Sequence, residues 1–432
     1  NHVAPGLDPN AVRRFGDRCA VEPGPVAVGS CKVHDEVRVV LDLAQHRLDL
    51  LRLTPPGADV GGEPLDLSHC HVPVTVQDSP HALGDAPLHE HTDFDHSTPP
   101  AFTPPDTELV QRERLVTSRA AENLFWLGRY TERAENATCL ARIVLQSLHG
   151  EEEPSIGHLM WIGQLAESAG LVPDDCPSPL DDRVEFERQL IGALGDTEDT
   201  PSVGYTLRNL RQAGSALRER LSPEHWNFIK QAEDTFLREA RRLRDDGGQG
   251  ADALQQLAAV SRALSAITGA QHDRMWRDDG WRLLSAGRQI ERLTYLSEAL
   301  SRGFYTNAVH DAAGFGVVLD LFDSTISFHA RYQRSRAIAA LIEHVVLNFE
   351  NPRSLGWVVQ TLNGRLARLH EREPGPLEDL SKRLQPPGAD QLTRLCQSDH
   401  IGDFVHLQAL LQQFMKAGAQ LSTDISLRHF TH

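Results

Sequence analysis

The sequence has little lysine and a deficit of positive charge. Lysine occurs only as Lys32, Lys230, Lys382 and Lys416, and acidic residues outnumber basic ones, which gives a formal net charge of −17. This charge disfavours non-specific binding to nucleic acid or to an anionic membrane surface. No apolar run approaches the ~20 residues that a membrane-spanning helix needs. We therefore expect neither nucleic acid nor a membrane among the partners.

The chain also lacks the short motifs of the common enzyme classes. It contains no P-loop, GxSxG or HExxH sequence, and no Glu-x-x-His pair on a predicted helix, which disfavours a di-metal bundle. The cysteines are scattered without a CxxC pair, which indicates reduced thiols in the cytoplasm. We expect no metal and no cofactor in this chain. These cysteines are Cys19, Cys31, Cys70, Cys139, Cys176 and Cys396.

Residues 1–115 are rich in proline, glycine and histidine and show little helical periodicity. Two proline-rich runs, "TPPGADVGGEP" and "STPPAFTPPD", are typical of linkers. The stretch 36–53 is consistent with a strand followed by a helix or with one amphipathic helix. The histidines of 69–96 have the composition of a metal-binding run, but also that of a His-rich linker. We predict a poorly ordered segment here.

From residue 116 onward the pattern changes to long amphipathic runs. Ser118 is predicted as the N-cap of the first helix and Gly150 as its stop. Because no long stretch alternates with period 2, residues 116–432 are predicted to form an all-α helical bundle. The further predicted helical runs are 157–170, 183–195, 202–220, 223–245, 251–269, 276–301, 313–348, 352–371 and 403–424.

One motif occurs twice in this helical region. "WLGRYTER" (126–133) and "SAGRQIER" (285–292) share the core GRxxER at an offset of 159 residues. The repeat predicts two related helical halves with the two motif helices at equivalent positions. A mid-helix glycine costs about 1 kcal/mol relative to alanine, so two of them at matched sites suggest a close approach by another helix.

The charges of the motif have two interpretations. On a helix Arg129 lies beside Glu132 and Arg133, with Trp126 and Tyr130 nearby, so the polar ribbon is either half buried and internally neutralised or an ordinary solvated face. In the first case the GRxxER helices face a shared polar interior.

Several stretches resemble one known family. "SRAAENLFWLGRYTERAEN" (118–136) resembles the opening signature of the bacterial alpha-E domain family, once catalogued as a domain of unknown function. "MWRDDGWRLLSAGRQIERLTYL", "LFDSTISFHARY", "NPRSLGWVVQTL" and "LSTDISLRHF" resemble further family motifs in order, and "LRERLSPEHW" fits a sixth. Gln212 and Asn348 stand where members often have a carboxylate. The resemblance covers residues 116–432.

The resemblance implies a helical domain whose genes lie beside, or are fused to, circularly permuted ATP-grasp ligases. Transglutaminase-like and other peptidase-like proteins accompany them, and the implied role is in peptide synthesis or tagging. ATP and Mg²⁺ would then be bound by a partner ligase. Residues 1–115 are similar to an interdomain junction with a faint likeness to a ligase tail, and Asn1 as first residue fits the C-terminal part of such a fusion.

Spacing and resemblance together give the candidate site. Asn351 and Pro352 are predicted to begin a helix with Arg353 at its positive end, where an anion would bind. The leading hypothesis is an accessory domain whose arginines hold a peptide or acyl-phosphate. One alternative is an independent peptide-modifying enzyme with Glu132 or Glu291 as general base, and another is a purely structural interaction module. The candidate binding residues are Glu122, Asn123, Trp126, Arg129, Tyr130, Arg133, Arg288, Arg292, Asp323, Tyr332, Asn351 and Arg353.

Overall fold

The computed structural model describes residues 116–150, 153–245, 247–372, 379–398 and 403–430, and no β-strand occurs among them. The predicted linker 1–115 and its His-rich stretch 69–96 lie outside the described residues. The α-helices are α2 (Ser118–His149), α3 (Ile156–Ser168), α4 (Arg183–Ala193), α5 (Val203–Ser215), α6 (Pro223–Asp245), α7 (Gly250–Asp273), α8 (Asp279–Tyr305), α9 (Ala312–Leu321), α10 (Thr325–Tyr332), α11 (Ile338–Ile342), α12 (Leu355–Arg372), α13 (Leu392–Leu395) and α14 (Val405–His429).

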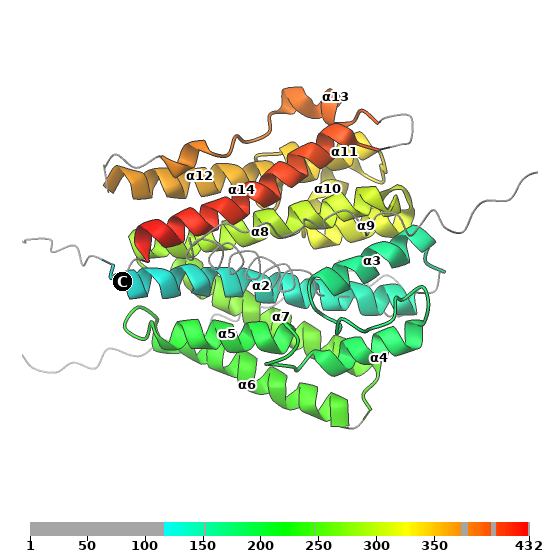
Figure 1. Ribbon diagram of the computed structural model, residues 1–432, viewed down its shortest axis with the longest axis horizontal. Helices are drawn as coiled ribbons and strands as arrows, with labels where there is room; N and C mark the ends of the chain where they lie inside the picture. The colour runs from blue at the N-terminus through cyan, green and yellow to red at the C-terminus, as the bar shows by residue number, and fades with distance from the viewer. Residues whose placement is uncertain (1–115, 151–152, 246, 373–378, 399–402, 431–432) are drawn as a thin grey trace, which may run out of the picture.

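Two long helices, α2 and α8, lie in the middle of the bundle (Figure 1). Helices α12 and α14 pack against α8 on one side, whereas α5 and α7 pack against α2 on the other, and α6 covers α5 and α7. The prediction of an all-α bundle is confirmed. The helix that carries the first GRxxER motif and the helix that carries the second are therefore direct neighbours in the centre of the fold.

The ends of α2 follow from local side-chain chemistry. The N-cap of α2 is Thr117, one residue before the predicted Ser118. The Thr117 hydroxyl accepts the Ala120 amide at 3.3 Å. Gly150 follows the last helical residue, as predicted.

The predicted continuous run 313–348 is wrong. It divides into α9, α10 and α11 and a five-residue π-helix, Glu343–Leu347. The backbone takes positive φ values at Asp323 (45°) and Gln333 (55°), and each interrupts the helical hydrogen bonding. The apolar spacing continues through both breaks because the segments all pack on the same core.

The two motif glycines lie where α2 and α8 touch. A Cβ built on Gly128 would be 2.0 Å from the carbonyl oxygen of Leu284, and one built on Gly287 would be 2.4 Å from that of Phe125. Each glycine thus meets the residue that stands three places before the other glycine. The two helices run in the same direction (Figure 1), and only a residue without a side chain allows their backbones this contact.

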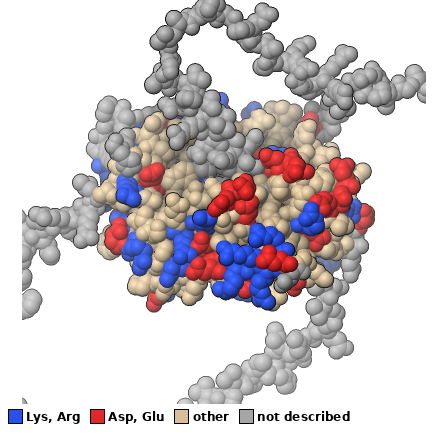
Figure 2. Space-filling view, turned by 60° about the horizontal axis from the view of Figure 1, so that its bottom comes forward, with Lys and Arg blue, Asp and Glu red and all other residues tan. Residues whose placement is uncertain are grey.

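The surface carries charges of both signs. On the face formed by α5 and α6 the acidic and basic side chains are interspersed (Figure 2), and Arg211, for example, contacts both Glu233 and Asp234 there. Among the described residues no helix is long and apolar enough to cross a membrane. The described cysteines, Cys139, Cys176 and Cys396, form no disulfide with one another.

We predict that Gly128→Ala lowers the free energy of unfolding by about 2 kcal/mol or more, because the new methyl group would meet backbone atoms that cannot move away alone. The matched control is Gly364→Ala within α12, where a Cβ meets no heavy atom within 4 Å. That variant should instead be stabilised by about 0.5–1 kcal/mol through its better helix propensity. Urea unfolding followed by circular dichroism measures both, and similar effects at the two sites would refute the close contact.

Candidate functional site: a buried glutamate–arginine network

The two GRxxER motifs bind each other across the α2–α8 interface. Glu291 accepts hydrogen bonds from Arg129 Nε at 2.5 Å and from Arg133 Nε at 2.7 Å. Glu132 accepts hydrogen bonds from Arg292 Nε at 2.6 Å and from Arg288 Nη2 at 2.9 Å. Each glutamate is therefore held by the two arginines that flank the other glutamate in sequence.

The arginines and glutamates of this network are buried. The side chains of Glu132, Glu291 and Arg133 have no exposed surface, and those of Arg129 and Arg288 are 5% and 4% exposed. The interpretation of the motif as a solvated face is wrong. The predicted polar interior shared by the two motif helices is confirmed, but its ion pairs run between the helices rather than along one of them.

A further arginine brings the network to the molecular surface. Arg353 approaches Glu132 Oε1 at 3.4 Å and Glu135 Oε2 at 3.5 Å, and its side chain is 23% exposed. Glu135, 14% exposed, also binds Arg288 Nη2 at 3.1 Å and the hydroxyl of Thr268. This edge, formed by Arg353 and Glu135, is the outward-facing part of the network.

The turn that presents Arg353 differs from the prediction. Helix α12 begins at Leu355, and its first turn is capped by the Ser354 hydroxyl, which accepts the Trp357 amide at 3.1 Å. Asn351 does not cap the helix. Its Oδ1 accepts the Arg353 amide at 3.1 Å, while its Nδ2 donates to Ser324 Oγ at 3.0 Å. The side chain of Asn351 is thus engaged in holding the turn and not in binding a ligand.

Burial and charge act in opposite directions on the ionisation of the network. Burial alone would raise the pKa of Glu132, but Arg292, Arg288 and Arg353 outweigh it and hold that pKa well below its ordinary value. Burial is also the main influence on Arg292 and lowers its pKa, with Glu132 acting against it. For Arg353 the nearby Glu132 and Glu135 outweigh burial and raise the pKa. The shifts of Glu132 and Arg353 both favour the charged form of the group.

The aromatic residues of the first motif cover these charges. The guanidinium of Arg129 lies 5.2 Å from the ring centroid of Trp126, and that of Arg133 lies 5.1 Å from the ring of Tyr130. The centroids of these two rings lie 5.7 Å apart, and the ring planes are tilted by 31°. Cation–π contacts of this kind stabilise a desolvated guanidinium, which explains why one helix carries so much charge and so much aromatic surface together.

Four other candidates lie outside the ion pairs of the network. Glu122 is half buried on α2, and Asn123 donates back to the Arg119 carbonyl at 2.8 Å. Asp323 is exposed at its positive-φ position, where its charge acts on Arg353. Tyr332 packs in an aromatic cluster, 5.0 Å from the ring of Phe328.

Sequence reasoning missed several participants. Glu135 stands one helical turn after Glu132, so its spacing was a usable signal. Gln271 had no such signal: it comes from α7, donates to Thr131 Oγ1 at 2.7 Å and accepts from Arg288 at 3.5 Å. Only the tertiary fold brings it to the network.

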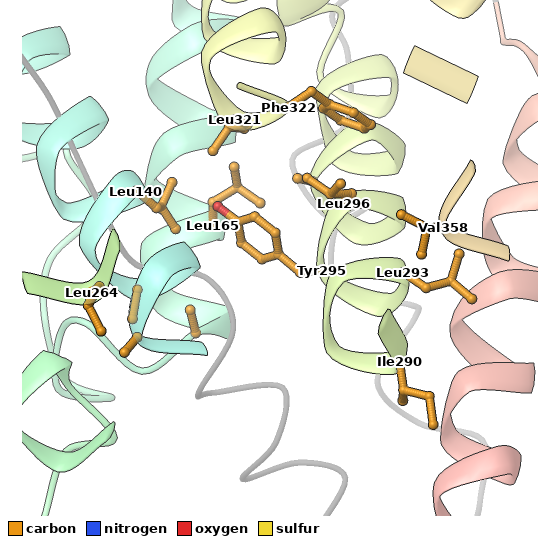
Figure 3. Packing of buried hydrophobic residues seen from close by; sticks show 14 of the residues in the cluster. Leu140, Leu165, Leu264, Ile290, Leu293, Tyr295, Leu296, Leu321, Phe322 and Val358 are labelled. Atoms are coloured by element: carbon orange, nitrogen blue, oxygen red, sulfur yellow. The ribbon is translucent and has the colours of Figure 1, made fainter. Parts of the chain in front are cut away.

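Tyr295 lies one turn after Glu291 and is buried. Its hydroxyl points toward Leu140 and Leu165 (Figure 3). Among the described residues this hydroxyl finds no hydrogen-bond partner, and the same holds for Nδ2 of Asn136, which stands one turn after Glu132 on α2. Burial raises the pKa of Tyr295 well above its ordinary value. Both groups therefore remain neutral polar neighbours of the charged network.

A groove of about 850 Å³ lies elsewhere, between α6 and α7. Its lining includes Phe228, Phe236, Gln256 and Val260 and none of the candidate site residues. Within the described part of the chain, no group of three or more His, Cys, Asp or Glu side chains is placed to hold a metal ion.

A family model for a predicted α-helical domain with a conserved ER motif, Alpha-E, matches residues 116–430. The chain belongs to the Alpha-E family. Among the described residues, Glu132-Arg133 and Glu291-Arg292 are the Glu-Arg dipeptides with both side chains buried. They are the natural candidates for the ER motif of the Alpha-E domain.

The curated relatives are longer proteins. The uncharacterized protein Rv2567 of Mycobacterium tuberculosis is 24% identical over 355 residues, which cover 76% of this chain and 39% of the relative. The uncharacterized protein Mb2597 of Mycobacterium bovis matches to the same extent. The chain thus spans about two fifths of the length of these relatives. No solved structure matches the Alpha-E domain of this chain.

We predict that Glu132→Gln lowers the free energy of unfolding by about 3–5 kcal/mol, because three guanidiniums would then surround a neutral amide in a buried site. The control is Glu371→Gln, which removes an exposed pair with Arg368 and should leave the urea midpoint unchanged. Equal midpoints for the two variants would show that the network contributes no more than a surface pair.

The pKa of Glu132 also predicts a pH dependence. Because it is lower in the folded state than the ordinary 4.5, the stabilisation is complete above that value and is lost as the pH falls below it. The urea midpoint of the wild type should therefore fall more steeply than that of Glu132→Gln between about pH 5 and pH 3. Parallel curves for the two proteins would contradict the lowered pKa.

Proposed function

We propose that this Alpha-E domain is a helical accessory domain that works with an ATP-grasp ligase, fused or separate, in peptide- or amide-bond synthesis. Its part is to hold an anionic group, a peptide carboxylate or an acyl-phosphate, at the edge formed by Arg353 and Glu135. ATP and Mg²⁺ belong to the ligase. The greater length of the curated relatives fits an Alpha-E domain that operates beside further sequence.

The observation that carries this proposal is the position of Arg353. Its contacts with Glu132 and Glu135, at 3.4 and 3.5 Å, are longer than those of the four motif arginines with their glutamates. Its side chain is also more exposed than theirs. A guanidinium that is held loosely above a rigid charged network can turn toward an incoming oxyanion and bind it through two parallel N–H donors.

The same geometry favours binding over independent catalysis. A general base needs a pKa near the working pH and access to a proton of the substrate. Glu132 has a strongly lowered pKa and no exposed surface, and Glu291 is equally buried between two arginines. Glu132 therefore meets neither requirement, and Glu291 lacks access to a substrate proton. The motif arginines are engaged by the glutamates, so their part is to hold the Arg353 edge in place.

The test is reconstitution with the ligase encoded beside, or fused to, the Alpha-E domain. Arg353→Gln should lower the rate of product formation about tenfold or more, the loss expected for a charged hydrogen bond, while ATP binding by the ligase stays unchanged. Arg353→Lys, which keeps the charge but not the fork, should recover only part of the rate. The control is Arg334→Gln, an exposed arginine after α10, which should behave as the wild type.

Three results would overturn the proposal. Equal product rates with and without the Alpha-E domain, together with no complex in gel filtration, would exclude the accessory role. Full activity of Arg353→Gln in a working complex would leave the domain a purely structural module. Turnover of a peptide without ligase or ATP would establish the independent-enzyme alternative.

A further inference from the structure

A second group of arginines surrounds Trp281 in the first turn of α8. The guanidinium carbon of Arg277 lies 4.0 Å from the ring centroid of Trp281, and that of Arg365, from α12, lies 4.8 Å from it. The indole is itself fixed, because it is buried and its Nε1 donates to the Gln271 carbonyl at 3.0 Å. One rigid aromatic ring thus holds two guanidiniums from different segments.

These two guanidiniums differ from those of the buried network in having no carboxylate partner among the described residues. Arg277 donates to the carbonyl of His272, and Arg365 Nε donates to Ser285 Oγ at 3.2 Å. Two nearby acids are already engaged by other arginines. Asp279 pairs with Arg282 at 2.7 Å and with Arg372 at 3.4 Å, and Asp278 pairs with Arg220.

The lack of a carboxylate partner is consistent with the direction in which the pKa of Arg365 is shifted. Its pKa is lowered, first by burial and then by the positive charges of Arg277 and Arg282. Like charges that are not neutralised by a carboxylate repel each other, and a bound anion would relieve the repulsion. This local excess of positive charge stands out in a chain whose formal net charge is −17.

An exposed aromatic side chain lies next to the cluster in sequence. Trp276 immediately precedes Arg277, and 85% of its surface is exposed. Tryptophan is enriched at binding interfaces relative to the rest of a protein surface. The backbone amides at the amino end of α8 do not supply this anion site, because the Trp281 amide already donates to Asp278 Oδ1 at 3.0 Å.

We infer that Arg277 and Arg365 form a binding site for an oxyanion, the carboxylate or phosphate group of a small acidic ligand, and that Trp276 contacts an apolar part of the same ligand. Guanidiniums that have no carboxylate partner keep N–H donors available for paired N–H···O bonds with either group. The site is distinct from the edge at Arg353, where the guanidinium faces carboxylates of the protein. The inference does not depend on a ligase partner.

The test uses two pairs of simple probes on the full chain. Inorganic phosphate and phenyl phosphate form one pair, and acetate and benzoate form the other; binding is measured by ligand-observed NMR titration. The aromatic member of at least one pair should bind more tightly than its small partner. The pair that binds identifies the source of the oxyanion as phosphate or carboxylate.

Variants locate the binding. Arg365→Gln and Arg277→Gln should each weaken the aromatic probe about tenfold or more, and Arg365→Lys should recover part of the affinity. Trp276→Ala should weaken the aromatic probe but leave its small partner unchanged. The control is Arg241→Gln on α6, an exposed arginine that lines a different hollow.

Circular dichroism and the thermal midpoint of each variant confirm that it is folded. The inference is overturned if neither pair of probes binds the wild type, or if folded Arg277→Gln and Arg365→Gln bind as the wild type does. It is also overturned if Arg241→Gln weakens binding as much as they do, because the effect would then come from overall charge. None of these results bears on the Arg353 variants in the ligase assay.

Discussion

The carboxylates of Glu132 and Glu291 are shielded from water, so the arginines around them must balance their charge. This requirement organises the structure. Removing an ionised glutamate from solvent costs several kcal/mol, and only well-placed guanidiniums offset that cost. Glu132 and Glu291 obtain their guanidiniums from the opposite helix. This pairing between the helices requires α2 and α8 to lie side by side in one register. Gly128 and Gly287 allow that distance, since any larger residue would force the helices apart.

The remaining elements are arranged around this central pair of helices. Helix α12 lies against α8, and the turn before it, which Asn351 holds, brings Arg353 to the outer edge of the network. The same helix brings Arg365 to Trp281 about three turns further along. The face between α8 and α12 thus presents one arginine held by protein carboxylates and one that lacks them. The Arg353 edge is thus supported by the carboxylates of the network, whereas the proposed anion site at Arg365 has none.

Much of the fold could be predicted from the sequence, because apolar residues at helical spacing mark helices that pack on a core. The repeated GRxxER core also indicated a shared polar interior. The pairing of each glutamate with arginines of the other helix was not predictable, because the spacing between Arg129 and Glu132 is the same whether Arg129 binds Glu132 or Glu291. The breaks at Asp323 and Gln333 were missed because a positive φ leaves no trace in hydrophobic periodicity. The relation between the two whole halves stays a prediction.

The central claim is that α2 and α8 are held together by ion pairs between them, and a double-mutant cycle on Glu132 and Arg292 tests it most directly. Unfolding free energies are measured for the wild type, Glu132→Gln, Arg292→Gln and the double variant. Residues in one buried network should show a coupling free energy of about 1.5 kcal/mol or more, with the double variant less destabilised than the sum of the singles. Additivity within about 0.5 kcal/mol would show that the two residues act independently and would contradict the account.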